Sequence, residues 1–164
     1  MRIRWIVAMV AAALTLSACG AKETFETIAD EHVQAAAAAH RAVHVVLPQG
    51  ASAPVVQGES GQLYVCENYE MWLQTLPGGD LRKTVKAVSG FEREELTVLQ
   101  QQNGTLKRYD FVWTSAGENG AEIGRAAILD DGNYHYVLTA MCSAQDAALV
   151  RGEWNAAFQS FSLG

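Results

Sequence analysis

Three turn signals divide the stretch that decides the fold, LTVLQQQNGTLKRYDFVWTSAGENGAEIGRAAILDDGNYHYVLTAMC, residues 96–142. Each signal, at residues 103–104, 119–120 and 131–132, is an Asn-Gly or Asp-Gly pair between two runs of strand-forming residues. Such pairs supply the positive φ angles that tight type I′ turns need. The stretch therefore predicts a meander of antiparallel strands, Leu96–Gln101, Leu106–Thr114, Glu122–Leu129 and Tyr134–Cys142.

The end of the chain predicts a closing helix. Ser143 and Asp146 have the spacing of a capping box. Apolar residues then recur at helical spacing and form one stripe: Ala147, Val150, Trp154, Ala157, Phe158 and Phe161. This stripe is the face that the helix would bury.

One strand of the meander alternates between two kinds of side chain. Tyr109, Phe111 and Trp113 share one face of the strand, and Arg108 and Asp110 share the other. We expect the three aromatic residues to lie in one core beneath the closing helix, where they would meet its residues Trp154, Phe158 and Phe161.

The upstream half predicts further elements. Residues 25–39, rich in alanine, predict an N-terminal helix. Residues 42–47 predict a first strand, and residues 63–66 and 69–76 predict a strand pair. Asp80 would cap a central helix that Gly90 ends. The expected fold class is α+β: a single antiparallel β-sheet of about six or seven strands, packed with an N-terminal, a central and a C-terminal helix.

This order of elements, together with the end of the chain, resembles PsbP/Mog1-like domains. The likeness covers residues 40–163, and its most specific part is the final strand Tyr134-His135-Tyr136-Val137-Leu138-Thr139 followed by a helix ending Phe158-Gln159-Ser160-Phe161. Small bacterial lipoproteins of unassigned function carry such domains. The resemblance implies a binding, assembly or accessory role, and it brings no catalytic residues with it.

The N-terminus predicts export and a lipid anchor. Arg2 and Arg4 precede an apolar run from Trp5 to Leu16, and Leu16-Ser17-Ala18-Cys19 has the form of a lipobox. The run is shorter than the roughly 20 residues that a spanning helix needs. We expect a cleaved signal peptide at residues 1–18, a lipidated tether at 19–24 and one domain at 25–164. Cys19 would carry the lipid, on the extracytoplasmic face of the cell membrane.

The charge balance narrows the choice of partners. The chain has 12 Lys and Arg against 18 Asp and Glu, a net charge of −6, and cleavage would remove the two positive charges of the signal peptide. Such an acidic domain repels nucleic acid and anionic headgroups. We expect no nucleic-acid partner, and an unknown envelope protein or small ligand instead. Arg82, Lys83 and Lys86 form a basic cluster that we interpret as a solvated helix face.

Two cysteines remain after Cys19 is used by lipid. Cys66 and Cys142 both stand at the ends of predicted strands. Two thiols in an exported domain usually form a disulfide, which we expect here, and the alternative is two buried free thiols. The sequence lacks a C-x-x-C motif, so the pair does not indicate redox catalysis.

No local motif indicates catalysis, a cofactor or a metal. His40 and His44 have the spacing of two ligands on a helix, but the predicted helix ends near His40 and no third ligand is near in the sequence. We therefore expect a non-catalytic binding or accessory module at the cell envelope. The alternative is a secreted, lipid-anchored hydrolase that uses carboxylates such as Glu67, Glu70 or Asp110, since carboxylate pairs leave no local signature.

Overall fold

The computed structural model of the chain describes residues 38–58 and 61–164. Several predicted features lie outside these residues: the signal peptide, Cys19, the tether, and residues 25–37 of the expected N-terminal helix. In the part of the chain that is described, two α-helices accompany the sheet, α2 (Leu81–Ser89) and α3 (Ala147–Ser160). The expected α+β class is confirmed, with the central and the C-terminal helix present among residues 38–58 and 61–164, and the expected N-terminal helix is not among the helices of these described residues.

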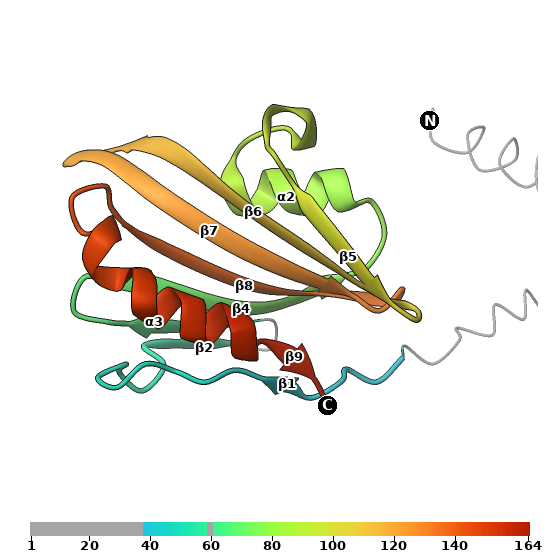
Figure 1. Cartoon of the computed structure of the whole chain (residues 1–164). Coiled ribbons are helices and arrows are strands. Elements are labelled where there is room, and N and C mark those ends of the chain that lie inside the picture. Colours follow the sequence, from blue (N-terminus) through green and yellow to red (C-terminus); the bar gives the residue numbers. More distant parts are fainter. Residues whose placement is uncertain (1–37, 59–60) are drawn as a thin grey trace, which may run out of the picture. The chain divides into compact units, whose positions relative to one another are not determined.

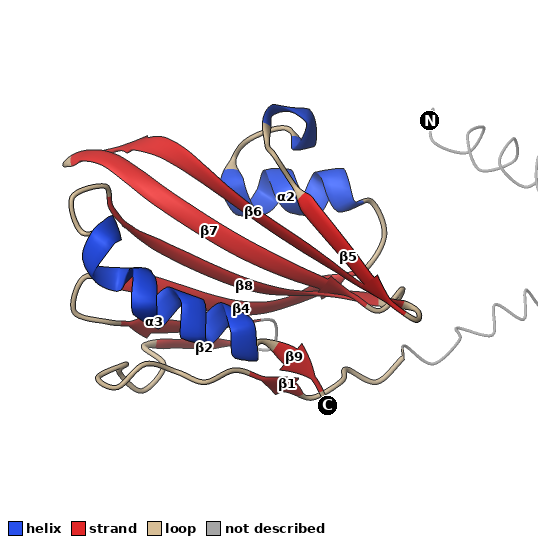
Figure 2. Cartoon of the chain, viewed as in Figure 1, coloured by secondary structure: helices blue, strands red, loops and turns tan. Residues whose placement is uncertain are grey.

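The sheet has seven antiparallel strands in the order β2-β3-β4-β8-β7-β6-β5 (Figures 1 and 2). Gly104, Gly120 and Gly132 have positive φ angles, but Asn103, Asn119 and Asp131 before them do not, so the turns are at the predicted places without being of type I′. The meander is confirmed, and its first strand begins three residues and ends two residues later than predicted. The strands are β2 (Val56–Gly58), β3 (Gly61–Val65), β4 (Tyr69–Pro77), β5 (Leu99–Asn103), β6 (Leu106–Gly117), β7 (Gly120–Asp130) and β8 (Tyr134–Ser143).

A short second sheet joins the two ends of the domain. β1 (Val43–His44) pairs with β9 (Ser162–Leu163). Beside it, the backbone N–H of Arg41 donates to the hydroxyl of Tyr136 at 2.8 Å, and the Arg41 guanidinium donates to the carbonyl of Gly164. These bonds hold Arg41 near the start of β8 and the end of the chain.

The two helices cover opposite faces of the large sheet, α3 in front and α2 behind (Figure 1). Asp80 caps α2 by accepting from the N–H of Arg82, and a short 3₁₀ helix, η1 (Arg93–Glu95), follows α2. Each helix has its own buried cluster. The α3 cluster includes Met71, Tyr136, Leu138, Trp154, Phe158 and Phe161, and the α2 cluster includes Val85, Tyr109, Phe111, Trp113, Ile128 and Val137.

The expected single core beneath the closing helix is therefore wrong. Tyr109, Phe111 and Trp113 are buried together, but they face α2 and not α3. Alternation along a strand shows which residues share a face, and it does not show which helix covers that face. The polar face of β6 meets α3 instead, where Arg108 donates to the carbonyl oxygens of Phe158 at 2.8 Å and Phe161 at 3.0 Å. Arg108 thus donates hydrogen bonds to carbonyl groups that have no partner within the helix, because they lie at its C-terminal end.

Among the described residues, no helix is long and apolar enough to cross a membrane.

Candidate functional site

A pocket of about 520 Å³ opens at the β3–β4 turn, beside the end of β8 and the beginning of β7. The turn is tight, because the N–H of Cys66 donates to the carbonyl of Tyr69 at 2.9 Å. This bond leaves Glu67 and Asn68 at the tip of the turn. We call this site the turn pocket, and it is lined by Val65, Cys66, Glu67, Asn68, Tyr69, Glu70, Glu122, Met141, Cys142 and Ser143.

A smaller pocket of about 180 Å³ adjoins the same turn on the side of α3. It shares residues 66–69 with the turn pocket and adds Leu149 and Glu153 from α3. A pocket therefore lies on each side of the turn, and Tyr69 lines both pockets.

Tyr69 occupies the centre of this region. Its side chain is buried, its hydroxyl donates to Oε2 of Glu153 at 2.9 Å, and its ring packs edge-on against Trp154. Burial, together with hydrogen bonds to Cys66 and Glu153, raises the pKa of the phenol far above its ordinary value. Tyr69 therefore stays protonated and acts as a donor, not as a base.

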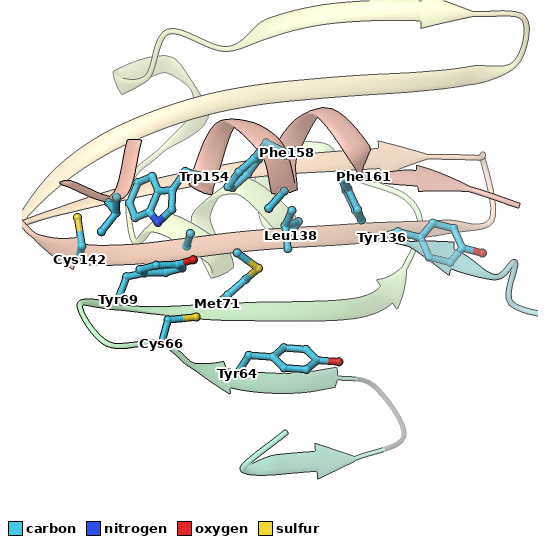
Figure 3. Packing of buried hydrophobic residues seen from close by; sticks show 14 of the residues in the cluster. Tyr64, Cys66, Tyr69, Met71, Tyr136, Leu138, Cys142, Trp154, Phe158 and Phe161 are labelled. Carbon is cyan, nitrogen blue, oxygen red and sulfur yellow. The ribbon is translucent and has the colours of Figure 1, made fainter. Parts of the chain in front are cut away.

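The predicted disulfide is absent, since Cys66 and Cys142 are both free and buried. Tyr69 stands between them, as Figure 3 shows. It pairs with Cys142 across β4 and β8, and it bonds to Cys66 across the turn. Two strand spacings of about 4.8 Å separate the cysteines by roughly 10 Å, beyond the 4.4–6.8 Å that a disulfide needs between Cα atoms. Strand order, which the sequence did not reveal, decides this outcome.

Both thiols are held in their neutral form. Burial raises the pKa of the Cys66 thiol, and the charge of Glu153 raises it further, while a hydrogen bond from Tyr69 opposes the shift. Burial and the charge of Asp146 likewise raise the pKa of Cys142. The thiolate is the nucleophilic form of cysteine, so these two residues are poorly suited to covalent chemistry at neutral pH.

The structure brings two of the three carboxylates named from the sequence to the turn pocket. Glu67 and Glu70 line it with exposed side chains, and Glu122 joins them from β7. Sequence reasoning missed Glu122, because only the pairing of Glu122 with Ser143 on β8 brings it to the pocket. Asp110 lies elsewhere, held by Arg108 through two hydrogen bonds of 2.7 and 3.0 Å.

His40, His44 and the basic cluster lie outside the turn pocket. His40 packs against Tyr134 with ring centroids 4.3 Å apart, and His44 is part of β1. Within residues 38–58 and 61–164, no three His, Cys, Asp or Glu side chains are grouped so that they could hold a metal ion. Arg82, Lys83 and Lys86 are exposed on α2, where Lys86 pairs with Glu92.

Comparison with known proteins identifies the fold. No family model and no curated protein matches the sequence. Among solved structures, the Ran-binding protein Mog1p of Saccharomyces cerevisiae aligns over 74% of this chain and 90% of its own, with 12% identity and a TM-score of 0.51. LpqN, involved in cell envelope biogenesis of Mycobacterium tuberculosis, aligns over 76% of this chain and 84% of its own, with 9% identity and a TM-score of 0.50.

A protein from Bacteroides thetaiotaomicron has the same fold over part of its length. It aligns over 74% of this chain at 11% identity, with a TM-score of 0.52, and this chain spans 45% of it. The predicted resemblance to Mog1/PsbP-like domains is thus confirmed for the fold. At identities this low, no functional residue of these proteins can be assigned to a position in this chain.

Proposed function

We propose that this chain is a lipid-anchored envelope protein whose domain is a non-catalytic binding or accessory module. The lipobox at Cys19 supports the anchor and the extracytoplasmic location. The fold supports a binding role, since it is shared with a Ran-binding protein and with a protein of cell envelope biogenesis.

The observation that carries the proposal is the composition of the turn pocket. Its volume of about 520 Å³ falls in the range of small-ligand sites, roughly 300–1,000 Å³. The buried groups that line it, Cys66, Tyr69 and Cys142, are all uncharged, whereas the carboxylates of Glu67 and Glu70 are exposed. Buried neutral groups beside an exposed charged rim suit the binding of a ligand.

The position of the pocket also favours binding. Arg41 lies beside Tyr136, and Cys142 lies six residues further along β8, which corresponds to about 20 Å. Residues Arg41 to His44 therefore leave the turn pocket open.

The charge of the rim indicates the kind of ligand. Glu67, Glu70 and Glu122 disfavour an anion, so we expect a cationic small molecule or a basic side chain of an envelope protein.

A thermal-shift series with spermidine, arginine, glucose and citrate tests this proposal. We expect spermidine or arginine at saturation to raise the Tm of the mature chain by roughly 5 °C, and citrate to leave it unchanged. Glu122→Gln should reduce that shift, whereas Glu94→Gln, on η1 outside the pocket, should preserve it. Equal shifts for all three proteins, or no shift with either cation, would contradict a cation site in the turn pocket.

A further inference from the structure

β6 is longer than its outer neighbour, and this leaves part of the sheet edge open. β5 pairs with β6 only from Leu106 to Asp110, with Leu99 opposite Asp110. The rest of β6, Phe111–Gly117, pairs with β7 on one side. On the other side, no strand of the described residues pairs with it, and Figure 1 shows β6 extending past the end of β5. We call Phe111–Gly117 the open edge.

The open edge lacks the features by which proteins usually protect such a strand. Natural edges carry charged residues or prolines that prevent pairing with another chain. The segment Phe111-Val112-Trp113-Thr114-Ser115-Ala116-Gly117 contains neither. Its alternate residues Val112, Thr114 and Ala116 are exposed, so the face of the strand toward α3 is accessible.

Two exposed apolar side chains lie on the face of the sheet toward α3. Val112 is 59% exposed and Leu99 is 64% exposed. Leu99 pairs with Asp110, which lies two residues before Val112, so both side chains are on the side of the sheet that α3 covers. Between Leu99 and α3 lies a groove of about 390 Å³ whose lining includes Leu99, Arg125 and Phe158.

Arg125 adds a second positive charge to this groove, which also contains Arg108 and one carboxylate, that of Asp110. It pairs with Val112 across β6 and β7. Its guanidinium lies 4.3 Å from the centre of the Phe158 ring and donates to Oδ1 of Asn155 at 2.9 Å. It forms no direct ion pair with a carboxylate of residues 38–58 or 61–164, because Asp110, whose charge also acts on Arg125, is paired with Arg108.

We propose that the open edge binds an extended peptide segment of a partner protein, which adds a strand beside Phe111–Gly117 and places a carboxylate on Arg125. The unpaired backbone groups of the edge would bind a peptide in an extended conformation. The exposed Val112 and Leu99 would contact apolar side chains of that peptide, and the half-buried guanidinium would bind an acidic side chain. A side chain opposite Val112 starts about 10 Å from the Arg125 backbone, which extended Glu and Arg side chains can bridge.

A second copy of the chain fits this surface less well. Two open edges paired antiparallel would place Val112, Thr114 and Ala116 of the copy against one another, and none of these residues carries a carboxylate for Arg125. The inference does not rest on the turn pocket, which lies at the β3–β4 turn.

Fluorescence anisotropy of short labelled peptides tests the proposal. The probe is a peptide of alternating Thr and Val with one central Glu, and its match has Gln in that place. We expect the mature chain to bind the Glu peptide about tenfold more tightly than the Gln peptide, as for a hydrogen bond to a charged group. Arg125→Gln should remove this difference, and Arg82→Gln, on the opposite face of the sheet, should retain it.

A second variant covers the case in which Arg125→Gln fails to fold. Val112→Glu changes an exposed side chain beside Arg125, so it should leave the Tm nearly unchanged and weaken binding of the Glu peptide more than of the Gln peptide. Hydrogen exchange should slow in Phe111–Gly117 when the Glu peptide is added.

Three results would overturn the inference. The first is equal affinity for the two peptides in the unmodified chain. The second is unchanged exchange in the open edge at peptide saturation. The third is an edge already protected in the free chain, by a second copy seen in sedimentation or by the chain's own upstream residues.

Discussion

Gly124 lies directly beneath the indole of Trp113, its partner across β6 and β7. A Cβ atom placed on Gly124 would stand 2.2 Å from two atoms of that ring. The indole is 94% buried in the α2 cluster, so it has little room to move away. The glycine is therefore required by packing and not by a turn.

Gly124→Ala should lower the free energy of unfolding by about 1–3 kcal/mol, because an extra methyl group in a filled core forces side chains and backbone apart. Gly152→Ala is the matched control: its added Cβ meets nothing within 4 Å, and alanine favours the helix α3. Urea denaturation should show the control at or slightly above the stability of the unmodified chain. An equal, small effect of both changes would show that Trp113 can shift.

Phe158→Ala should cost about 3–5 kcal/mol in the same assay. Phe158 is fully buried on the inner face of α3, and its ring contacts the guanidinium of Arg125. Leu149→Ala, on the same helix but 72% exposed, should change stability by less than about 0.5 kcal/mol. A loss below about 1 kcal/mol for Phe158→Ala would place that ring at the surface.

The stability of the domain should depend on pH through His135. The imidazole is 1% exposed, its Nδ1 lies 2.7 Å from Oγ1 of Thr84 on α2, and its Nε2 has no hydrogen-bond partner in the structure. Burial lowers the pKa of His135, while the charges of Asp130 and Asp131 oppose the shift in part. The folded state thus holds His135 neutral, whereas the unfolded chain gains a proton below about pH 6.5.

Stability should therefore be complete above about pH 6.5 and fall as the pH drops toward the lowered pKa. His135→Gln should be less stable near pH 7.5, since it loses a fitted side chain, but its stability should decline less between about pH 7 and 5. Equal declines for the two proteins in denaturation at each pH would show that His135 is not the group responsible.

Cys66 and Cys142 should remain reduced in the native protein. Denaturation without reductant, followed by alkylation and mass spectrometry, should add a label to each thiol, and the native protein should react slowly because both side chains are buried. A species two mass units lighter that takes no label at either residue would instead show a disulfide, and it would require β3 and β8 to approach more closely.

Cys19 should carry the lipid. Labelled palmitate should be incorporated by the unmodified chain and not by Cys19→Ala, and the variant should leave the membrane fraction. Cys142→Ala should label like the unmodified chain, which separates lipidation from the other thiols. Equal labelling of the Cys19 variant would contradict the lipid anchor, and it would not bear on ligand binding at the turn pocket.

Much of the fold could be predicted because its signals are local. The turns at Gly104, Gly120 and Gly132 follow from the positive φ angles that glycine permits, and the caps of α2 follow from Asp80 and Gly90. The periodicity of β6 and that of α3 also identified which face of each element is buried. Each of these features depends on neighbours within a few positions of the chain.

The arrangement of these elements could not be read in the same way. Pairing of β4 with β8 joins Tyr69 to Cys142, and it separates the two cysteines that the sequence suggested were bonded. Glu122 reached the turn pocket through the same sheet. Local signals determined the strands, the turns, the helices and the buried faces. Only tertiary packing decided which helix covers each face, and which residues meet, because strand order depends on contacts between segments far apart in the chain.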